Sequence, residues 1–215
     1  MTVVAADDPR ALDRAAAELE AGRPVVVPTD TVYGLAARAA DHAAVATIFE
    51  WKDRPRHQVM AVLVASLDQA RSLANFTASA SALADAFWPG PLTLVLERRD
   101  DATLALGAPS ATVGVRWPKA DFVVALARRV GPLTTTSANR HGLETPSSAA
   151  GVVTQLDRGD VLVVDGGELG GQPSTVVDAT GPDPQVLRIG PVSERSVQVV
   201  SRADVSPDSR GPAGP

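Results

Sequence analysis

Along the chain, short apolar runs alternate with longer segments in which apolar residues recur three or four positions apart. The first of these segments carries an apolar stripe from Leu12 to Leu19, which predicts a helix packed on a core. We expect Asp8 to cap this helix, Pro9 to occupy its first position and Gly22 to follow its end. Helical spacing recurs in five further segments, at about residues 41–51, 67–74, 79–87, 120–130 and 147–156.

The short apolar runs, rich in Val and Leu, predict strands. They lie at residues 24–28, 60–64, 92–97, 112–116, 133–136, 161–164, 174–178, 186–189 and 197–200. Strands that alternate with helices predict an α/β domain, but the cluster of strands after residue 160 breaks strict βαβ succession and predicts a mixed sheet. We therefore expect one domain over residues 1–200, with helices flanking a mixed sheet, and a disordered tail over residues 201–215.

Composition excludes several classes of function. The 215 residues include 20 Lys and Arg and 25 Asp and Glu, and this formal charge of −5 argues against a generally basic protein that coats nucleic acid. There is no cysteine, which excludes disulfides, iron–sulfur clusters, thiolate zinc sites and a cysteine nucleophile. The sequence shows neither a signal peptide nor a membrane-spanning run, so we expect a cytoplasmic location.

The common signature motifs are also missing. The sequence contains no G-x-x-x-x-G-K-[ST], no G-x-G-x-x-G that opens a helix, no H-E-x-x-H and no G-x-S-x-G. His42, His57 and His141 are scattered, and we assign no metal-ligating residue. Any chemistry must therefore come from other groups.

Three cations lie within five positions at the end of a predicted helix, at Lys52, Arg54 and Arg56. If this segment is extended, the three side chains alternate onto one face and form an anion site. If it remains helical, the cations instead complement the negative end of the helix dipole. Proline at position 55 favours an extended Arg54, although the spacing alone slightly favours the second interpretation.

Small polar residues follow two predicted strands. Residues 28–35 and residues 132–139 both place hydroxyl groups at a strand end, where α/β proteins commonly bind ligands, although such residues also form ordinary turns. Arg116 and Arg188 each end a further apolar strand. Together with the Lys52 cluster, these arginines predict a site for several negative groups.

The motifs PTDTVYGL, KDRP, WPGPLTLVL, VGVRWP, PLTTTSAN, STVVD and LRIG occur in this order over about residues 10–195. In content, order and spacing the sequence resembles the YrdC-like threonylcarbamoyl-AMP synthases. Each motif is weak by itself, but seven in order are specific. The resemblance implies a twisted α/β fold with a mixed sheet and a large concave, electropositive cavity.

The resemblance also implies a reaction. L-Threonine, bicarbonate and ATP, often with Mg²⁺, give L-threonylcarbamoyladenylate and pyrophosphate. The product feeds the formation of threonylcarbamoyladenosine at position 37 of ANN-decoding tRNAs, and a separate threonylcarbamoyl transferase complex moves the group to the tRNA. For this chain we expect at most weak contact with tRNA itself and no membrane partner. Such chemistry depends on positioning and charge neutralisation, which fits the absence of cysteine.

Carried over residue by residue, the resemblance assigns a site. The set expected to act in catalysis consists of Lys52, Arg54, Ser137 and Asn139. The expected threonine contacts are Thr31, Arg116, Ser137 and Ser174. The expected ATP contacts are Arg54, Thr112, Asn139, Ser147 and Arg188. We assign no general base.

The sequence departs from the pattern of the family at three places. Asp53 stands where a glycine is common, and its carboxylate would weaken anion binding if it pointed into the site. Val59 and Met60 replace Pro-Leu, and Leu63 replaces a histidine that contacts threonine. The change at Leu63 leaves open a related synthase with altered amino-acid specificity. A separate alternative is a double-stranded RNA-binding or ribosome-maturation module that uses the same cavity.

Overall fold

A computed structural model describes residues 1–55, 58, 60–156 and 160–203. Its helices are α1 (Ala11–Glu20), α2 (His42–Lys52), α3 (Leu67–Arg71), α4 (Ala78–Phe87), α5 (Asp121–Val130), α6 (Ala149–Leu156) and α7 (Glu194–Ala203). Its strands are β1 (Thr2–Ala5), β2 (Val25–Val27), β3 (Gly34–Arg38), β4 (Ala61–Leu63), β5 (Ala74–Asn75), β6 (Leu92–Arg98), β7 (Thr112–Arg116), β8 (Leu133–Ser137), β9 (Leu162–Asp165), β10 (Thr175–Asp178) and β11 (Gln185–Arg188).

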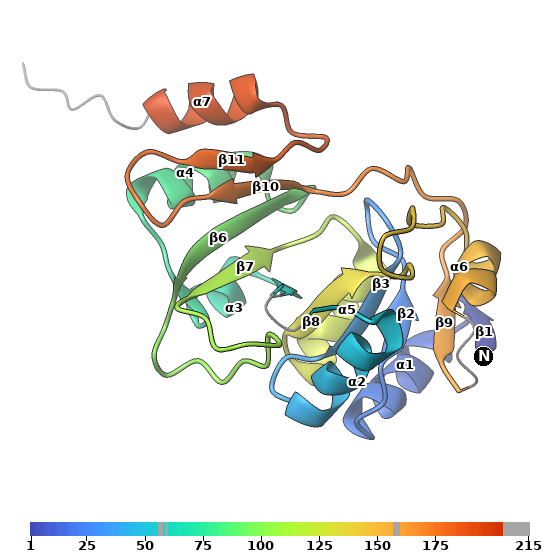
Figure 1. The fold of residues 1–215 in the computed structure, drawn as a ribbon. Coiled ribbons are helices and arrows are strands. Elements are labelled where there is room, and N and C mark those ends of the chain that lie inside the picture. The colour runs from blue at the N-terminus through green and yellow to red at the C-terminus, as the bar shows by residue number, and fades with distance from the viewer. Residues whose placement is uncertain (56–57, 59, 157–159, 204–215) are drawn as a thin grey trace, which may run out of the picture.

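The strands form one twisted, mixed sheet in the order β1-β9-β2-β3-β8-β4-β7-β6-β10-β11, with β5 paired to β6 (Figure 1). The pairs β1–β9, β2–β9, β4–β7 and β6–β10 are parallel. The remaining pairs, such as β3–β8 and β6–β7, are antiparallel. The prediction of an α/β domain with a mixed sheet is confirmed.

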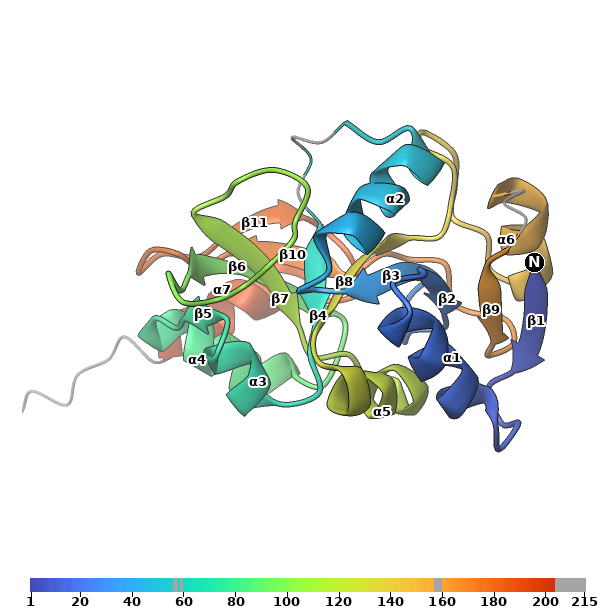
Figure 2. The same ribbon diagram turned by 90° about the horizontal axis from the view of Figure 1, so that it is seen from below.

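Helices pack on the sheet in three groups (Figure 2). In the half that contains β2 and β9, α1 and α5 cover one face and α2 and α6 cover the other. In the half that contains β6, β7 and β10, α3, α4 and α7 contribute to a core on one face only. The opposite face of these strands is left for the cavity described below. The helices of the described residues are all too short or too polar to cross a bilayer.

The predicted strand at residues 197–200 is wrong, because these residues lie within α7. Val197 and Ser201 are buried while Val199 is 61% exposed, which is the three-to-four-residue spacing of a helix. A short apolar run cannot be assigned to strand or helix by periodicity alone. Helix α7 also includes residues 201–203 of the predicted tail, and residues 204–215 lie outside the described residues.

Other differences concern element ends and weak strands. Helix α1 begins after Arg10 rather than at Pro9, and the Asp8 carboxylate accepts a hydrogen bond from the Arg10 amide at 2.8 Å. The predicted helix at residues 67–74 ends at Arg71, where the chain turns into β5. Strands β1, β3 and β5 were not predicted. The sequence of β3, GLAAR, has little intrinsic strand preference and is held in place by pairing with β2 and β8.

Candidate functional site

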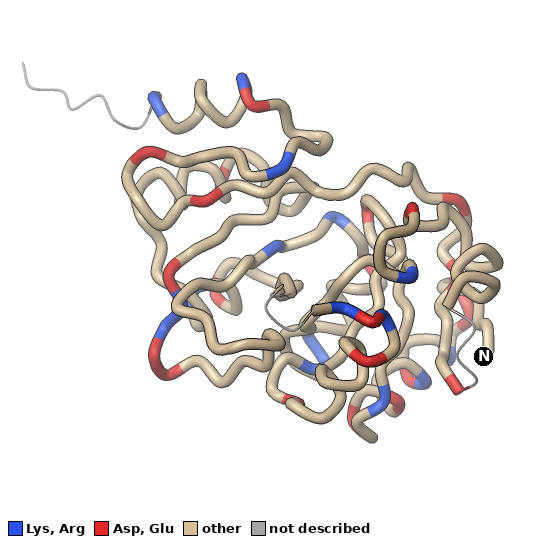
Figure 3. The backbone as a smooth tube through the Cα atoms, viewed as in Figure 1, with Lys and Arg blue, Asp and Glu red and all other residues tan. Residues whose placement is uncertain are grey.

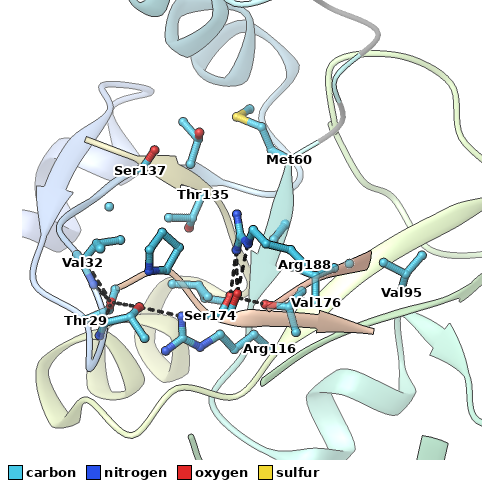
Figure 4. A pocket seen from close by; sticks show the side chains of 18 of the residues that line it. Thr29, Val32, Met60, Val95, Arg116, Thr135, Ser137, Ser174, Val176 and Arg188 are labelled. Atoms are coloured by element: carbon cyan, nitrogen blue, oxygen red, sulfur yellow. Dashed lines mark hydrogen bonds between the residues drawn. The ribbon is translucent and has the colours of Figure 1, made fainter. Parts of the chain in front are cut away.

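A cavity of about 370 Å³ lies over the uncovered face of the sheet (Figure 4). The residues that line its wall recur at every second position along the strands, because successive side chains of a strand point to opposite faces of the sheet. On β7, Val113 and Val115 enter the core, while Thr112, Gly114 and Arg116 line the cavity. The same alternation places the second and fourth residues of β6 and the second residue of β10 in the wall, at Thr93, Val95 and Val176. Each of these strands therefore contributes one set of alternate residues to the core and the other set to the cavity wall.

Small residues form the middle of the cavity floor. Ala61 on β4 is paired with Thr135 on one side and with Gly114 on the other. Gly114 is paired in turn with Val95. A floor without large side chains allows a substrate to lie close to the backbone of the sheet.

Arg116 is held at one end of the cavity by three contacts. Its Nε donates to the carbonyl oxygen of Gly90 at 3.0 Å, and its Nη1 donates to Thr31 Oγ1 at 2.9 Å. Its Nη2 donates to the carboxylate of Asp30 at 2.5 Å. The side chain of Arg116 is 6% exposed and that of Asp30 is 14% exposed, so this ion pair is largely buried. The guanidinium group carries five N–H donors, and these three contacts leave two of them for a ligand.

Arg188 approaches the same end from β11. Its Nε and Nη2 donate to the carbonyl oxygen of Ser174, and Nη2 also donates to Ser174 Oγ at 3.2 Å. Ser174 Oγ lies 2.9 Å from Thr93 Oγ1 on the neighbouring strand. Burial lowers the pKa of the Arg188 guanidinium, and the positive charge of Arg116 lowers it further. The two guanidinium groups therefore repel each other, and an anion placed between them would relieve this repulsion.

The wall of the cavity is electropositive. Arg54, Arg116 and Arg188 line it, whereas none of the described lining residues is Asp or Glu. Burial lowers the pKa of the Arg54 guanidinium, whose Nε donates to the carbonyl oxygen of Gln58 at 3.0 Å. Elsewhere acidic and basic residues are spread over the whole molecule (Figure 3). The net charge of −5 thus hides a local concentration of positive charge.

Lys52 lies beside this cavity but outside its wall. It is the last residue of α2 and only 2% exposed, and its ammonium group reaches the last residue of β8 and the segment that follows it. It donates to the carbonyl oxygen of Ser137, to that of Asn139 at 2.6 Å and to Asn139 Oδ1 at 3.0 Å. Burial and the positive charge of Arg54 lower the pKa of Lys52 to about 7.

Because the pKa of Lys52 is lowered in the folded protein, the free energy of unfolding should depend on pH. Between about pH 7 and the ordinary lysine value of 10.5, the unfolded chain binds more protons than the folded chain at this group. The free energy of unfolding should therefore gain up to about 1.4 kcal/mol per pH unit from Lys52 as the pH rises. Urea denaturation at pH 7, 8 and 9 should show this slope for the wild type and lose it in Lys52→Met. Lys119→Met, at an exposed lysine, should keep the slope, and equal slopes for all three proteins would contradict the assignment.

The cationic segment is not continuously extended, so neither simple interpretation from the sequence holds in full. Arg54 does leave the helix, but Lys52 is still helical and Asp53 has a left-handed backbone with φ of 50°. Asp53 is exposed and does not line the cavity, so its carboxylate does not enter the site. Arg56 and Val59 lie outside the described residues.

The left-handed backbone at Asp53 predicts a stabilising substitution. Asp53→Gly should raise the free energy of unfolding by about 0.5–1 kcal/mol, because left-handed backbone costs an L-residue more than the extra entropy that glycine loses on folding. Urea denaturation would measure the change. Asp53→Ala is the matched control and should destabilise, because alanine lacks the short polar side chain that tolerates this conformation. A loss of stability in Asp53→Gly would count against this explanation.

Most residues assigned from the sequence meet at the cavity. Seven of them line it, namely Thr31, Arg54, Thr112, Arg116, Ser137, Ser174 and Arg188. Lys52 and Asn139 lie behind the wall and contact each other. Ser147 does not line the cavity: it is exposed, and its hydroxyl donates to the carboxylate of Glu168 at 2.6 Å.

The sequence analysis missed Asp30 as a functional residue, although it lies in a motif that was singled out. Its carboxylate is the charged partner of Arg116. Thr29 was missed as well: its hydroxyl accepts from the amides of Thr31 and Val32 and so shapes the loop that carries Asp30. A carboxylate between two threonines directly after a buried strand was the available signal. The sequence does not show its partner, because only the pairing of the strands brings Arg116 to it.

Leu63, which replaces the histidine of the family pattern, lines the cavity next to Arg116. Its strand pairs in register with β7, so that Leu63 and Arg116 are directly opposite each other. Leu63 is 4% exposed and Met60, another departure, also lines the wall. The cavity is therefore more apolar beside Arg116 than a histidine would make it.

Among the described residues, no group of three or more His, Cys, Asp or Glu side chains could hold a metal ion. The carboxylate of Asp30, which contacts the cavity-lining Arg116, is already paired with that arginine. The side chains in this part of the chain therefore do not fit a protein-held magnesium ion.

Comparisons with known proteins agree with the motifs. The Sua5–YciO–YrdC family model, described as "Telomere recombination", matches residues 17–190. A putative threonylcarbamoyl-AMP synthase of Mycobacterium tuberculosis is 38% identical over 199 residues, which cover 92% of this chain and 92% of that protein.

Two solved structures show the same fold. The structure of Pyrococcus abyssi Sua5 complexed with L-threonine has a TM-score of 0.82 and 36% identity, over 88% of this chain and 56% of that chain. The structure of Escherichia coli YciO has a TM-score of 0.82 and 26% identity, over 91% of this chain and 98% of that chain. This chain therefore spans little more than half of the Pyrococcus protein and most of the other two relatives.

Proposed function

This chain belongs to the Sua5–YciO–YrdC family of threonylcarbamoyl-AMP synthases, and we propose that its cavity condenses L-threonine, bicarbonate and ATP. The single observation that best supports this use of the cavity is its wall, which combines three arginines with small and hydroxyl side chains and contains no carboxylate among the described residues. Such a wall fits substrates that carry a carboxylate, a carbonate and a triphosphate.

The reaction has two steps. The neutral amine of threonine attacks the carbon of bicarbonate, and loss of water leaves a carbamate. A carbamate oxygen then attacks the α-phosphorus of ATP. The bond between the α-phosphorus and the oxygen that bridges to the β-phosphorus breaks, and pyrophosphate is released. The reactants are anionic at both steps, so catalysis depends on charge neutralisation and on positioning.

In this proposal Arg116 binds the carboxylate of threonine through its two remaining N–H donors, with Thr31 and Ser174 beside it. Arg188 and Arg54 neutralise the phosphate and carbamate oxygens. Arg188 lies close enough to Arg116 for the two charges to interact. An adenylate that joins the two substrates would therefore lie across the floor of Ala61 and Gly114.

Magnesium would enter with ATP as part of the MgATP substrate. The product would be consumed by a threonylcarbamoyl transferase complex that modifies adenosine 37 of tRNA. Direct contact of this chain with tRNA or double-stranded RNA gains no support from any particular group of residues described above.

The proposal is tested by incubating the protein with MgATP, bicarbonate and one amino acid at a time, and by measuring pyrophosphate. We expect release with threonine and weaker release with serine, because one methyl group provides only about 1–3 kcal/mol of discrimination. Valine should also be tested, since Leu63 makes the wall beside Arg116 apolar. Pyrophosphate release that needs no amino acid, or none at any magnesium concentration, would contradict the proposal.

A further inference from the structure

The ammonium group of Lys52 has no donor left for a substrate. An ammonium group carries three N–H donors. The structure places three oxygen acceptors around it, which are the carbonyl oxygens of Ser137 and Asn139 and the side-chain Oδ1 of Asn139. Lys52 is 2% exposed and does not line the cavity. Direct contact with ATP or threonine would require it to give up at least one of these bonds.

The Asn139 side chain, which supplies one of the three acceptors, is itself fully hydrogen-bonded. Asn139 Oδ1 also accepts from Ser137 Oγ at 2.5 Å. Asn139 Nδ2 donates to the carbonyl oxygens of Arg140 at 3.0 Å and Leu143 at 2.5 Å. Each polar atom of the Asn139 side chain thus has two partners. Removing Lys52 takes away one bond to this side chain and two bonds to the backbone beside it.

Lys52 also connects two parts of the cavity wall. Arg54 lines the wall two residues after Lys52, and Ser137 lines it at the end of β8. The ammonium group joins the end of α2 to the end of β8 and so fixes Arg54 and Ser137 relative to each other. A displacement of about 1 Å between such groups can cost about 100-fold in rate.

We infer that Lys52 is a positioning residue, which acts through Ser137 and Asn139 to hold Ser137 and Arg54 in the cavity wall and does not touch the substrates. This inference rests on the proposed synthase activity for its kinetic readout. It assigns to Lys52 a task different from the direct catalytic contact that the resemblance to the family implies.

A double-mutant cycle between Lys52 and Asn139 tests the inference. Lys52→Met should lower kcat about 100-fold, and Asn139→Ala should lower it by a similar factor. Because both act through one network, the double variant should be no more than about 3-fold below the worse single variant. Losses that multiply would overturn the inference, because they would mean that Lys52 acts independently of Asn139.

The pH dependence gives a second readout that a general loss of packing would not produce. Burial and the Arg54 charge lower the pKa of Lys52 to about 7, and the groups that face it from the segment after β8 are uncharged. Deprotonation removes one of its three donors, so kcat/KM of the wild type should fall above about pH 7 relative to the rise that deprotonation of the threonine amine produces. Lys52→Arg keeps its charge and should lose this alkaline limb, even if its rate is lower. An unchanged limb in Lys52→Arg would overturn the inference.

Stability distinguishes failure of this inference from failure of the proposed function. The same cycle, measured by urea denaturation, should show coupling between Lys52 and Asn139 whether or not the protein makes an adenylate. Lys119→Met, at the chain's other lysine, is the matched control. Its equilibrium constant of unfolding and its kcat should both stay within about 2-fold of the wild-type values. Additive stabilities would overturn the network, whereas a coupled pair in a protein without synthase activity would contradict the proposed function alone.

Discussion

Arg116→Met is expected to lower kcat/KM for threonine by about 30–1,000-fold, or about 2–4 kcal/mol, because the carboxylate of threonine loses its buried, charged hydrogen-bond donor. The variant also leaves the Asp30 carboxylate without its cation, which should lower the free energy of unfolding by about 3 kcal/mol. Pyrophosphate assays across a range of threonine concentrations and urea denaturation measure the two effects. The ATP dependence should change much less.

Two further variants separate charge from geometry at this pair. Arg116→Lys keeps the charge but cannot make the three contacts to Gly90, Thr31 and Asp30 together, so it should recover stability better than activity. Arg99→Ala removes an exposed pair with Asp101 and should change stability by no more than about 0.5 kcal/mol. A threonine KM near the wild-type value in Arg116→Met would show that this arginine does not bind the amino acid.

Gly190→Ala is expected to destabilise the protein by about 2–3 kcal/mol and to disturb the cavity from outside it. A Cβ atom at this position would lie 2.3 Å from the carbonyl oxygen of Pro173 and 2.5 Å from the amide nitrogen of Thr175. Both atoms belong to the backbone and can only move together with Ser174 between them. Since Ser174 accepts from Arg188, the shift should also reduce kcat/KM.

Gly181→Ala is the matched control for this prediction. No heavy atom lies within 4 Å of the position that its Cβ would occupy. Its free energy of unfolding should stay within about 0.5 kcal/mol of wild type. Urea denaturation of both variants measures the difference in the free energy of unfolding. A Gly190→Ala protein as stable as the control would show that the backbone from Pro173 to Thr175 can shift without loss of stability.

The sequence predicted most of the fold because most elements carry a strong pattern. Strands β6 and β7 alternate clearly, and helices such as α5 show an unbroken apolar stripe. Strand β3 escaped prediction because glycine and alanine give little local preference, and its identity depends on two neighbouring strands. Helix α7 was read as a strand because four consecutive residues cannot separate the two periods.

The site, like the fold, could be predicted from the sequence only in part. The resemblance to the family, confirmed by the family match, identified the motifs, and seven of the assigned residues meet at one cavity. The buried pair of Asp30 with Arg116 joins residues 86 positions apart, and the Lys52 network joins residues 87 positions apart. Such partners depend on how the strands pair, which residue spacing does not encode. Residue type therefore predicted which residues gather at the cavity but not which of them line its wall.

Mass spectrometry of the product formed from ¹³C-labelled bicarbonate tests the central claim most directly. The protein, MgATP, threonine and labelled bicarbonate should yield an adenylate that contains threonine and one labelled carbon, in amounts equal to the pyrophosphate released. Arg116→Met should form far less of it. Pyrophosphate without a labelled adenylate, or an adenylate that contains threonine but no labelled carbon, would contradict the account.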